Sequence, residues 1–382
     1  MRKIQMVDLK SQYDNIKEEV NAGIQEVIDS TAFIKGGKVN DFQLNIEHYL
    51  GVKHVIPVGN GTDALQISLM ALGLKRGDEV ITPTFTFIAT AEVVALLGLT
   101  PVVVDVDPDT FCMSVDRVEK AITPKTKAIV PVHLFGQNAD MEALLKLADK
   151  HGLYVVEDAC QSIGAEYRFS DGRVKKSGCM GDFGCTSFFP SKNLGCYGDG
   201  GAIFTDDDAL AAEARCIANH GMVVRYHHDR IGVNSRLDSI QAAVLDVKLK
   251  YLDGYIRNRQ AAANFYDTAF ETCGRIKIPV RSRQSTHVFH QYTVCLDESV
   301  NRDLLRKRLD EKGIPAMIYY PIPLHLQKAY QDERYKAGDF PVAEKLVRTV
   351  LSLPMHTELD KEQLDFISKT VCQLIEECLI RR

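Results

Sequence analysis

Residues 54–72 of the chain read HVIPVGNGTDALQISLMAL. The segment His54–Val58 is a short apolar run without polar alternation, which is typical of a strand covered on both faces. Gly59-Asn60-Gly61 then turns the chain, and the apolar residues of Thr62–Leu72 recur at helical spacing. The stretch therefore predicts a strand, a tight glycine turn and a helix in that order.

The same unit recurs along the centre of the chain, after an N-terminal helical region of about 50 residues that is broken at Gly36-Gly37. Further strands are expected at Glu79–Thr82, Pro101–Val106, Ala128–Val132, Tyr154–Glu157 and Ala202–Phe204. The helices between them are expected at Ile88–Leu97, Met141–His151 and Asp207–Asn219. This alternation predicts an α/β fold with a mostly parallel sheet, in which ligands bind beyond the carboxyl ends of the strands.

The pattern changes to α+β after about residue 250. The expected elements there are a long helical run Leu237–Asn258, strands near Val288–Leu296, a helix Arg302–Gly313, a further element at Ile318–Leu324 and a last helix from Asp360. No Gly/Ser linker separates the two patterns. We therefore expect two closely packed domains, a large one over residues 1–250 and a smaller one over 251–382.

The composition is that of a globular protein and excludes several classes. The net charge is -5, and without a run of Lys or Arg it leaves no basic footprint for nucleic acid. No stretch approaches the roughly 20 apolar residues of a membrane span, and the N-terminus lacks the apolar core of a signal peptide. We expect a cytoplasmic protein that binds neither nucleic acid nor membranes. The 10 cysteines form no CxxC pair, so buried free thiols are expected, with a zinc site as the alternative.

The turn at Gly59–Thr62 is suited to a phosphate group. Its glycines let the backbone approach an anion, and the helix that follows offers free N–H groups and the positive end of its dipole. The spelling GxGxxA also matches a loose dinucleotide fingerprint. That fingerprint requires an acidic residue at the end of the next strand, where Thr82-Pro83-Thr84 stand instead. A phosphate site is predicted, and a nicotinamide cofactor is not.

Two further strand ends and one loop carry chemistry. Phe87 can stack on a planar ring or simply pack in the core. Asp158 can hold a metal, a ribose or a protonated ring nitrogen, or only cap a helix. In SFFPSKNLGCYGDGG, residues 187–201, Lys192 is either a desolvated nucleophilic amine or a solvated surface lysine. Together the phosphate turn, ring, carboxylate and lysine form the set that pyridoxal phosphate requires.

These motifs resemble those of the DegT/DnrJ/EryC1/StrS family of sugar aminotransferases. The resemblance runs from residue 7 to the C-terminal helix, and its most specific parts are GNGTDAL, TPTFTFIAT, VVEDACQSIGA, GDFGCTSFFPSKNLGCYGDGGAI, GVNSRLDSIQAAVL and YYPIPLHLQKAY. It implies the aspartate aminotransferase architecture of fold type I, with a large domain around a mostly parallel mixed sheet and a smaller α+β C-terminal domain.

Matched position by position, the resemblance implies that Lys192 carries pyridoxal 5'-phosphate covalently and that Asp158 partners its ring nitrogen. It implies that Phe87 stacks on the ring and that Gln161 contacts the phenolic oxygen.

For the phosphate, the matched positions are Gly61, Thr62 and Ser187. The asparagine matching Asn234 reaches the phosphate of the neighbouring subunit's cofactor in family members, which implies a homodimer with shared active sites.

The resemblance also implies glutamate and a nucleotide-linked keto sugar as substrates, in surface polysaccharide biosynthesis such as that of the lipopolysaccharide O-antigen. Members that aminate the 3-keto carbon of a UDP-linked N-acetyl hexuronic acid contact it at positions matched by Arg236, Tyr319 and Tyr320. A guanidinium can pair with a uronic carboxylate, which a dTDP-, UDP- or GDP-linked 4-keto-6-deoxy sugar lacks, although Arg236 can equally serve a helix end or an interface. His325 is a further candidate for this pocket, or a structural residue.

Two functional alternatives and one structural alternative remain. Family dehydratases carry histidine where this chain has Lys192, so dehydration is disfavoured, and a non-enzymatic subunit that has kept the fold is the other functional alternative. The segment Tyr167–Met180, with four basic residues, is interpreted as a solvated turn, or else lies near the neighbour's site.

Overall fold

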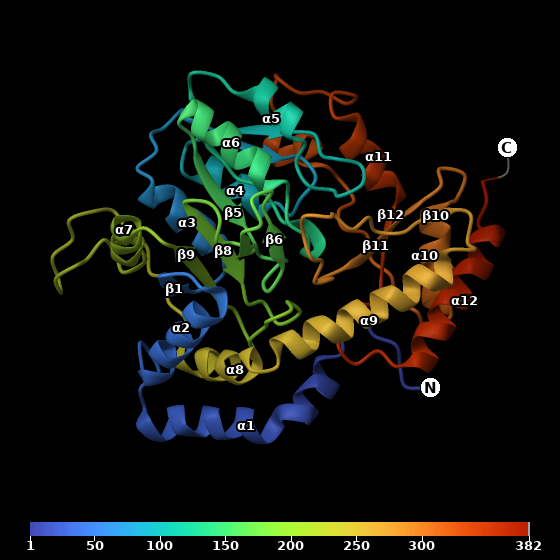
Figure 1. Cartoon of the computed structure of the whole chain (residues 1–382), viewed down its shortest axis with the longest axis horizontal. Helices are drawn as coiled ribbons and strands as arrows, with labels where there is room; N and C mark the ends of the chain where they lie inside the picture. The colour runs from blue at the N-terminus through green and yellow to red at the C-terminus, as the bar shows by residue number, and fades with distance from the viewer. Residues whose placement is uncertain (381–382) are drawn as a thin grey trace.

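The computed structural model describes residues 1–380, and a seven-stranded sheet lies at its centre (Figure 1). The strand order is β1-β9-β8-β5-β4-β2-β3. The strands are β1 (His54–Val58), β2 (Glu79–Pro83), β3 (Thr100–Val104), β4 (Thr126–Ile129), β5 (Tyr154–Asp158), β8 (Phe183–Ser187) and β9 (Gly201–Thr205). Neighbouring strands pair in parallel except at β9, which runs antiparallel to β1 and β8. The predicted α/β fold with a mostly parallel sheet is confirmed.

Helices cover both faces of this sheet. Successive residues of a strand point to opposite faces, so neighbouring residues contact different helices. On β5, Val155 packs in an apolar cluster with α5 and α6, whereas Val156 packs in a cluster with α3, α4 and α7. These helices are α3 (Gly61–Ala71), α4 (Ala89–Leu96), α5 (Val115–Ala121), α6 (Met141–His151) and α7 (Asp208–Ala218). Since both valines are buried, the strands are apolar without alternation.

The N-terminal helices lie at one edge of the molecule. They are α1 (Leu9–Ser30) and α2 (Gly37–Leu50), and both pack on α8 (Ser239–Leu249), which lies between α1 and the large sheet in Figure 1. The predicted break at Gly36-Gly37 separates α1 from α2. Gly36 is required there, because a Cβ atom would lie 2.3 Å from the carbonyl oxygen of Ala32.

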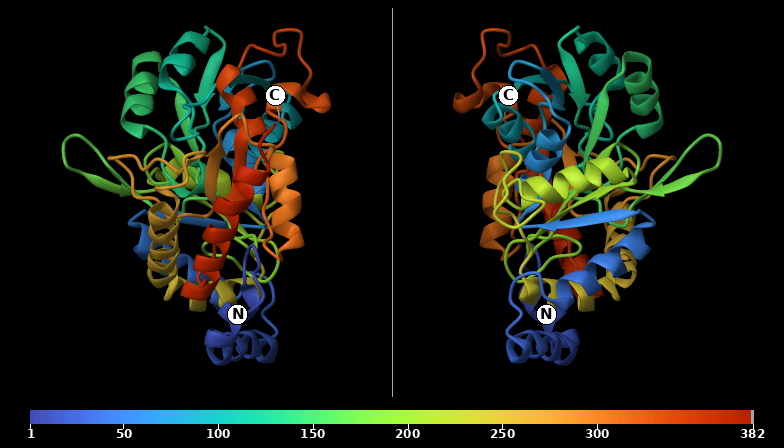
Figure 2. Two further views of the ribbon diagram at one scale, coloured as in Figure 1. Left: turned by 90° about the vertical axis from the view of Figure 1, so that its right-hand side faces the viewer. Right: turned by 90° about the vertical axis from the view of Figure 1, so that its left-hand side faces the viewer.

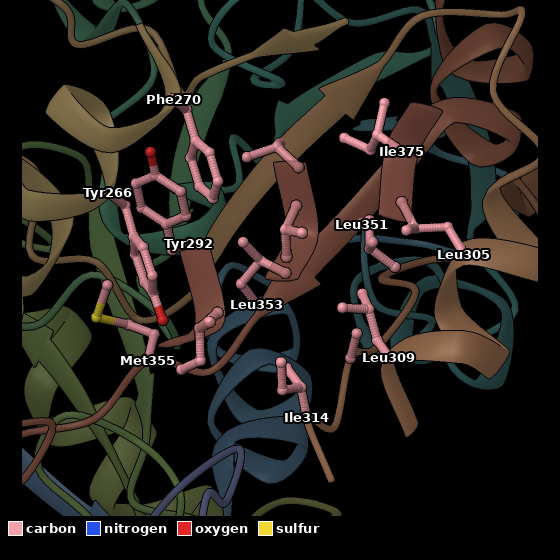
Figure 3. Close-up of a cluster of buried hydrophobic side chains, with 14 of the residues drawn as sticks. Tyr266, Phe270, Tyr292, Leu305, Leu309, Ile314, Leu351, Leu353, Met355 and Ile375 are labelled. Carbon is pink, nitrogen blue, oxygen red and sulfur yellow. The ribbon is translucent and has the colours of Figure 1, made fainter. Parts of the chain in front are cut away.

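The C-terminal part is built on an antiparallel sheet of order β10-β11-β12. Its strands are β10 (Ile276–Lys277), β11 (Tyr292–Leu296) and β12 (Val350–Leu353), and its helices are α9 (Leu252–Phe270), α10 (Arg302–Glu311), α11 (Pro341–Thr349) and α12 (Lys361–Glu377). A separate apolar core, with Tyr266, Leu309 and Ile375 among its members, joins this sheet to α9, α10 and α12 (Figure 3). The predicted domain boundary falls between α8 and α9 and stays a prediction, and residues 381–382 of the predicted small domain lie outside the described residues.

Several predicted elements were wrong in detail. The helical run Leu237–Asn258 is two helices, α8 and α9, interrupted at residues 250–251. Residues 318–323 belong to no named helix or strand, and Leu324 begins the short 3-10 helix η2 (Leu324–Leu326). Helices α5 and α11 and strands β8 and β12 were not predicted. Strand β8 contains Gly184, where a Cβ atom would lie 1.8 Å from the carbonyl oxygen of Gly178. Close backbone approach therefore decides the residue type there, against strand propensity.

The segment Tyr167–Met180 is not a simple solvated turn. It contains the antiparallel hairpin of β6 (Glu166–Arg168) and β7 (Val174–Lys176), which projects from the body of the molecule (Figure 2). Tyr167 is buried and donates its hydroxyl to Asp140 at 2.9 Å. Three of the four basic residues form ion pairs, namely Arg173 with Asp171, Lys175 with Asp206 and Lys176 with Glu166.

Within residues 1–380, no helix combines the length and apolarity needed to cross a membrane. All of the cysteines are free thiols. The predicted burial holds for six of them, whereas Cys160, Cys273, Cys295 and Cys372 are only partly buried. No cluster of three or more His, Cys, Asp or Glu side chains in this range is arranged to hold a metal ion.

Candidate active site

A cavity of about 630 Å³ lies where β1, β2, β5 and β8 end, at the carboxyl-terminal edge of the large sheet. Segments before β11 and before α11 close it from the C-terminal part of the chain. It is lined by most of the residues that the sequence predicts, namely Gly61, Thr62, Phe87, Asp158, Gln161, Ser187, Lys192, Tyr319 and Tyr320. The fold thus brings the phosphate turn, the ring, the carboxylate and the lysine together.

The loop that carries Lys192 is fixed from two sides. Asn193, the next residue, donates its side-chain amide to the carbonyl oxygen of Val288 at 2.9 Å. Lys248 of α8, which is almost completely buried, donates Nζ to the carbonyl oxygen of Gly195 at 2.6 Å. These two bonds hold the backbone that directly follows the lysine, whose side chain lines the cavity.

The surroundings of the Lys192 amine suppress its charge. Burial lowers the pKa of this amine from its ordinary value, and electrostatic interactions with the Cys160 and Asp158 side chains oppose the shift only in part. An amine that loses its proton more readily is a better nucleophile and can accept a proton at neutral pH. The solvated-surface interpretation of Lys192 does not agree with this environment.

Asp158 is the last residue of β5, and both of its carboxylate oxygens are held. Thr90 of α4 donates its hydroxyl to Oδ2 at 2.7 Å, and the backbone amide of Cys160 donates to Oδ1 at 3.2 Å. The side chain is buried apart from its cavity edge. Each carboxylate oxygen accepts more than one hydrogen bond, so Asp158 retains capacity for a cationic donor in the cavity.

The residue before it, Glu157, anchors the end of β5 from behind the cavity. His133 Nε2 lies 2.8 Å from Oε2 of Glu157, and both side chains are fully buried. Nδ1 of His133 accepts the amide of Ala139 at 3.1 Å, so Nε2 is the nitrogen that donates. The same carboxylate also accepts the backbone amides of Gly178, Met180 and Gly181. A buried carboxylate with four donors keeps this strand end in place.

The start of α3 forms an anion site on the cavity wall. Asn60 caps the helix by accepting the amide of Asp63 at 2.8 Å, while the amides of Gly61 and Thr62 have no acceptor within the helix. At Gly61 a Cβ atom would lie 2.8 Å from Cβ of Ser187. The glycine therefore lets the helix start pack directly on the end of β8, which places two N–H groups and a hydroxyl on one wall.

Aromatic residues form another wall of the cavity. Phe87 is 53% exposed, which is unusual for a phenylalanine beside a buried carboxylate. Gln161 accepts the amide of Phe135 at 2.8 Å and donates to the hydroxyl of Tyr320 at 3.1 Å. Burial raises the pKa of Tyr320 well above its ordinary value, so this hydroxyl stays protonated. The ring of Tyr320 lies 6.1 Å from that of Phe87.

Asn234 and Arg236 do not line this cavity. Asn234 is exposed and Arg236 is partly exposed, whereas Ser235 between them is buried. The hydroxyl of Ser235 donates to Asp63 at 2.6 Å and accepts the amide of Gly59 at 2.9 Å. Ser235 thus holds this segment next to the phosphate turn of its own chain, but the side chains of Asn234 and Arg236 do not line the cavity of that chain.

His325 was considered either a candidate for the substrate pocket or a structural residue, and it does not line this cavity. Its Nδ1 lies 2.9 Å from Oγ1 of Thr84, and its Nε2 lies 3.2 Å from Glu344. The ring is buried and lines a separate cavity of about 170 Å³. With both nitrogens engaged inside the protein, His325 is a structural residue.

The structure adds residues that the sequence did not single out, above all Thr90 and His290. His290 lines the cavity, and its Nδ1 has no hydrogen-bond partner among residues 1–380. Desolvation, together with the positive charges of Lys192 and Arg259, holds the pKa of His290 well below its ordinary value. The only sequence signal was two histidines in HVFHQYTV, a pattern that core residues share.

The residues around the cavity fit pyridoxal phosphate. The donors at Gly61, Thr62 and Ser187 suit a phosphate, Asp158 suits a protonated ring nitrogen, and Lys192 suits an aldehyde. Two buried polar atoms of the lining, Oγ1 of Thr86 and Nδ1 of His290, find no protein partner in the described part of the chain. Such atoms are satisfied when a polar ligand fills the space.

Comparisons with known proteins agree with this geometry. The family model of the DegT/DnrJ/EryC1/StrS aminotransferase family matches residues 14–372. The chain is 48% identical over 364 residues to UDP-2-acetamido-2-deoxy-3-oxo-D-glucuronate aminotransferase of Pseudomonas aeruginosa, with 95% of this chain and 98% of that protein covered. It is 44% identical over 369 residues to UDP-N-acetyl-3-dehydro-alpha-D-glucosamine 3-aminotransferase of Acidithiobacillus ferrooxidans, with 96% and 97% covered.

Among solved structures, NtdA from Bacillus subtilis with bound cofactor PMP superposes with a TM-score of 0.89 at 33% identity. The match covers 98% of this chain and 86% of that chain. PMP is the amine form of pyridoxal phosphate. Sequence and structural similarity therefore both extend over nearly the whole chain.

Proposed function

The chain belongs to the DegT/DnrJ/EryC1/StrS aminotransferase family, and from this premise we propose that it transfers the amino group of glutamate to the 3-keto carbon of a UDP-linked 2-acetamido-2-deoxy-hexuronic acid. The chain is a pyridoxal phosphate-dependent aminotransferase. The proposed sugar is supported by the Pseudomonas aeruginosa relative, whose name specifies a 3-oxo-glucuronate. Surface polysaccharide biosynthesis is the process that such an amino sugar serves.

The observation that carries the proposal is that Lys192, Asp158 and the start of α3 face one cavity. When bound, pyridoxal phosphate supplies a conjugated ring that accepts the electron pair left when a substrate C–H bond loses its proton. The Nζ atom of Lys192 is the group placed to take up this proton and to return it, because burial lowers its pKa.

The other cavity residues would hold and orient the cofactor. The carboxylate of Asp158 would accept a charge-assisted hydrogen bond from the ring nitrogen and keep that nitrogen protonated. The amides of Gly61 and Thr62, with the hydroxyl of Ser187, would bind the phosphate at the helix start. Phe87 would pack on the ring, and Gln161 presents its amide group at the cavity wall, where it donates to the hydroxyl of Tyr320.

Asn234 and Arg236 have a place in this scheme only if they serve a second subunit, so we include in the proposal a homodimer with shared active sites. The segment before them exposes large apolar side chains, with Tyr226 75% and Ile231 89% accessible. Clustered exposed apolar residues are typical of an interface. The cavity's own charged lining consists of Asp63, Asp158, Asp199 and Lys192. In the proposed dimer, a second subunit supplies cations for an anionic nucleotide sugar.

In this dimer, Arg236 distinguishes the uronic acid from a neutral sugar. A guanidinium pairs with a carboxylate through two parallel hydrogen bonds, which a neutral sugar cannot reproduce. Tyr319 and Tyr320 line the cavity near Phe87 and would contact the sugar beside the reacting carbon. A second candidate is the neutral 3-keto sugar linked to UDP, favoured by the relative from Acidithiobacillus ferrooxidans.

The two candidates are separated by one comparison. The protein is incubated with glutamate and either UDP-linked 3-keto N-acetyl sugar, with or without the C6 carboxylate, and the amino sugar is quantified by mass spectrometry. We expect the acid to be preferred by roughly tenfold or more in kcat/KM, since a charge-assisted pair contributes about 1.5–3 kcal/mol. Arg236→Lys should lose most of that preference. Equal losses on both sugars would remove the role of Arg236, and preference for the neutral sugar would select the second candidate.

A further inference from the structure

Thr90, the last residue of the motif TPTFTFIAT, is buried in the first turn of α4 and does not line the cavity. Its hydroxyl lies 2.7 Å from Oδ2 of Asp158 and 3.4 Å from the carbonyl oxygen of Phe87. A hydroxyl donates one hydrogen, and the shorter contact to a carboxylate takes it. The motif was singled out for Phe87, and the function described above uses no side chain at its end.

The hydrogen bond between Thr90 and Asp158 lies beside the part of the cavity that would bind the cofactor ring. Phe87 lies in the turn between β2 and α4, Thr90 lies in the first turn of α4, and Asp158 ends β5. The hydroxyl of Thr90 therefore ties the start of α4, three residues after Phe87, to the carboxylate at the end of β5. The other oxygen, Oδ1, receives only the amide of Cys160 at 3.2 Å, so Thr90 makes the shorter of the two contacts that orient Asp158.

A buried threonine at position 90 requires an acceptor for its hydroxyl, and Asp158 provides it. The neighbours of Thr90 in α4 are apolar, with Ala89, Ala91, Val93 and Val94 buried around it. Valine would fill the same volume without a polar atom, and a buried hydroxyl without an acceptor is destabilising. We propose that Thr90 is a positioning residue, which locks the carboxylate of Asp158 in the orientation that receives the protonated ring nitrogen of the cofactor. The inference rests on the role proposed above for Asp158.

The chain contains a matched control. Thr82 on β2 is fully buried like Thr90, but its hydroxyl has no hydrogen-bond partner among residues 1–380, and it does not line the cavity. Thr82→Val removes the same atom from the same kind of environment without touching Asp158. Thr90→Ser keeps the hydroxyl and removes only a methyl group.

The test uses the full-length protein loaded with pyridoxal phosphate. Three quantities are measured for the parent, Thr90→Val, Thr90→Ser and Thr82→Val: the dissociation constant of the cofactor by fluorescence titration, the pH midpoint of its visible absorbance band, and the melting temperature of the cofactor-free protein. For Thr90→Val we expect roughly tenfold weaker cofactor binding and a midpoint displaced upward by about one pH unit, because a ring nitrogen that is held less firmly withdraws fewer electrons. Thr90→Ser and Thr82→Val should stay within about twofold of the parent.

Parent-like binding and midpoint in Thr90→Val would overturn the inference, and so would a Thr90→Ser protein as impaired as Thr90→Val. If Thr90→Val does not fold, Thr90→Ala is measured against Thr82→Ala by the same two readouts, and equal behaviour of the two would overturn it. None of these readouts uses a sugar. A wrong sugar substrate would leave them unchanged, so the two proposals fail separately.

Discussion

Gly61 is a position in the cavity wall where the structure leaves no room for a side chain. A Cβ atom there would lie 2.8 Å from Cβ of Ser187 and 2.9 Å from Sγ of Cys160, both closer than side-chain atoms approach in folded proteins. Gly61→Ala should push the start of α3 off the end of β8, at a cost of about 1–3 kcal/mol. We expect at least about tenfold weaker binding of pyridoxal phosphate, measured by fluorescence titration.

The matched control is Gly37→Ala at the start of α2, where a Cβ atom meets nothing within 4 Å. That variant should bind the cofactor like the parent and melt at the same temperature or slightly higher. Parent-like cofactor binding in Gly61→Ala would show that the helix start is not the phosphate site.

The predicted residues that the fold brings to the cavity include several whose neighbours along the chain identify them. Lys192 and Gly61 stand in glycine-rich motifs, and Asp158 follows an apolar strand, so their chemistry could be inferred locally. Thr90 donates to Asp158, which is 68 positions away in the chain. His290 lines a cavity that only the fold creates. The two interpretations of His325 could not be separated for the same reason, since Thr84 and Glu344, which contact its ring, cannot be identified from the sequence.

At the scale of an element, α8 supports the loop of Lys192 through Lys248. Burial lowers the pKa of Lys248 from 10.5 to about 8, with opposing influence from Cys196 and a further lowering by Arg259. Between pH 8 and 10.5 the unfolded chain keeps this proton while the folded chain releases it, so the free energy of unfolding rises with pH across that window. Below pH 8 both states hold the proton, and the folded state bears the full burial cost.

Lys248→Met removes this titration. We expect the free energy of unfolding of the parent, minus that of the variant, to increase by a few kcal/mol between pH 7.5 and 10, as measured by urea unfolding at each pH. The difference isolates Lys248, because all other titrating groups are common to both proteins. A difference that stays constant or falls over this range would contradict the burial of a charged Lys248.

Element boundaries were predictable where residue patterns alone decide them and not where tertiary contacts do. Helix α6 agrees with its predicted bounds, since Asp140 caps it by accepting the amide of Ala143 and Gly152 ends it with φ of 63°. Strand β8 was missed because Gly184 gives no strand signal, although the approach of Gly178 requires it. The break between α8 and α9 has no glycine or proline to mark it.

At the scale of the whole molecule, shared sites predict complementation between two defective chains. Lys192→Ala removes the reactive amine, and Asn234→Ala removes the proposed contact to the neighbouring subunit's cofactor. In a mixed dimer, one site carries both changes and the other carries neither. Mixing the two inactive proteins under conditions of subunit exchange should therefore restore roughly a quarter of the parental activity, measured as amino sugar formed per total protein.

Each variant incubated alone is the control for that mixture. No recovery on mixing, in preparations shown by native mass spectrometry to contain mixed dimers, would mean that each site is complete within one chain. The exposed Asn234 would then need another explanation.

The measurement that tests the central claim most directly follows the nitrogen itself. Glutamate labelled with heavy nitrogen is incubated with the protein, pyridoxal phosphate and the UDP-linked 3-keto N-acetyl hexuronic acid, and the sugar is analysed by mass spectrometry. We predict that the parent places the labelled nitrogen on the former keto carbon, whereas Lys192→Ala shows neither labelled amino sugar nor the visible absorbance band of the bound cofactor. Label transfer by Lys192→Ala at the parental rate, or a parent protein that transfers no label to this or any related nucleotide-linked keto sugar, would contradict the account.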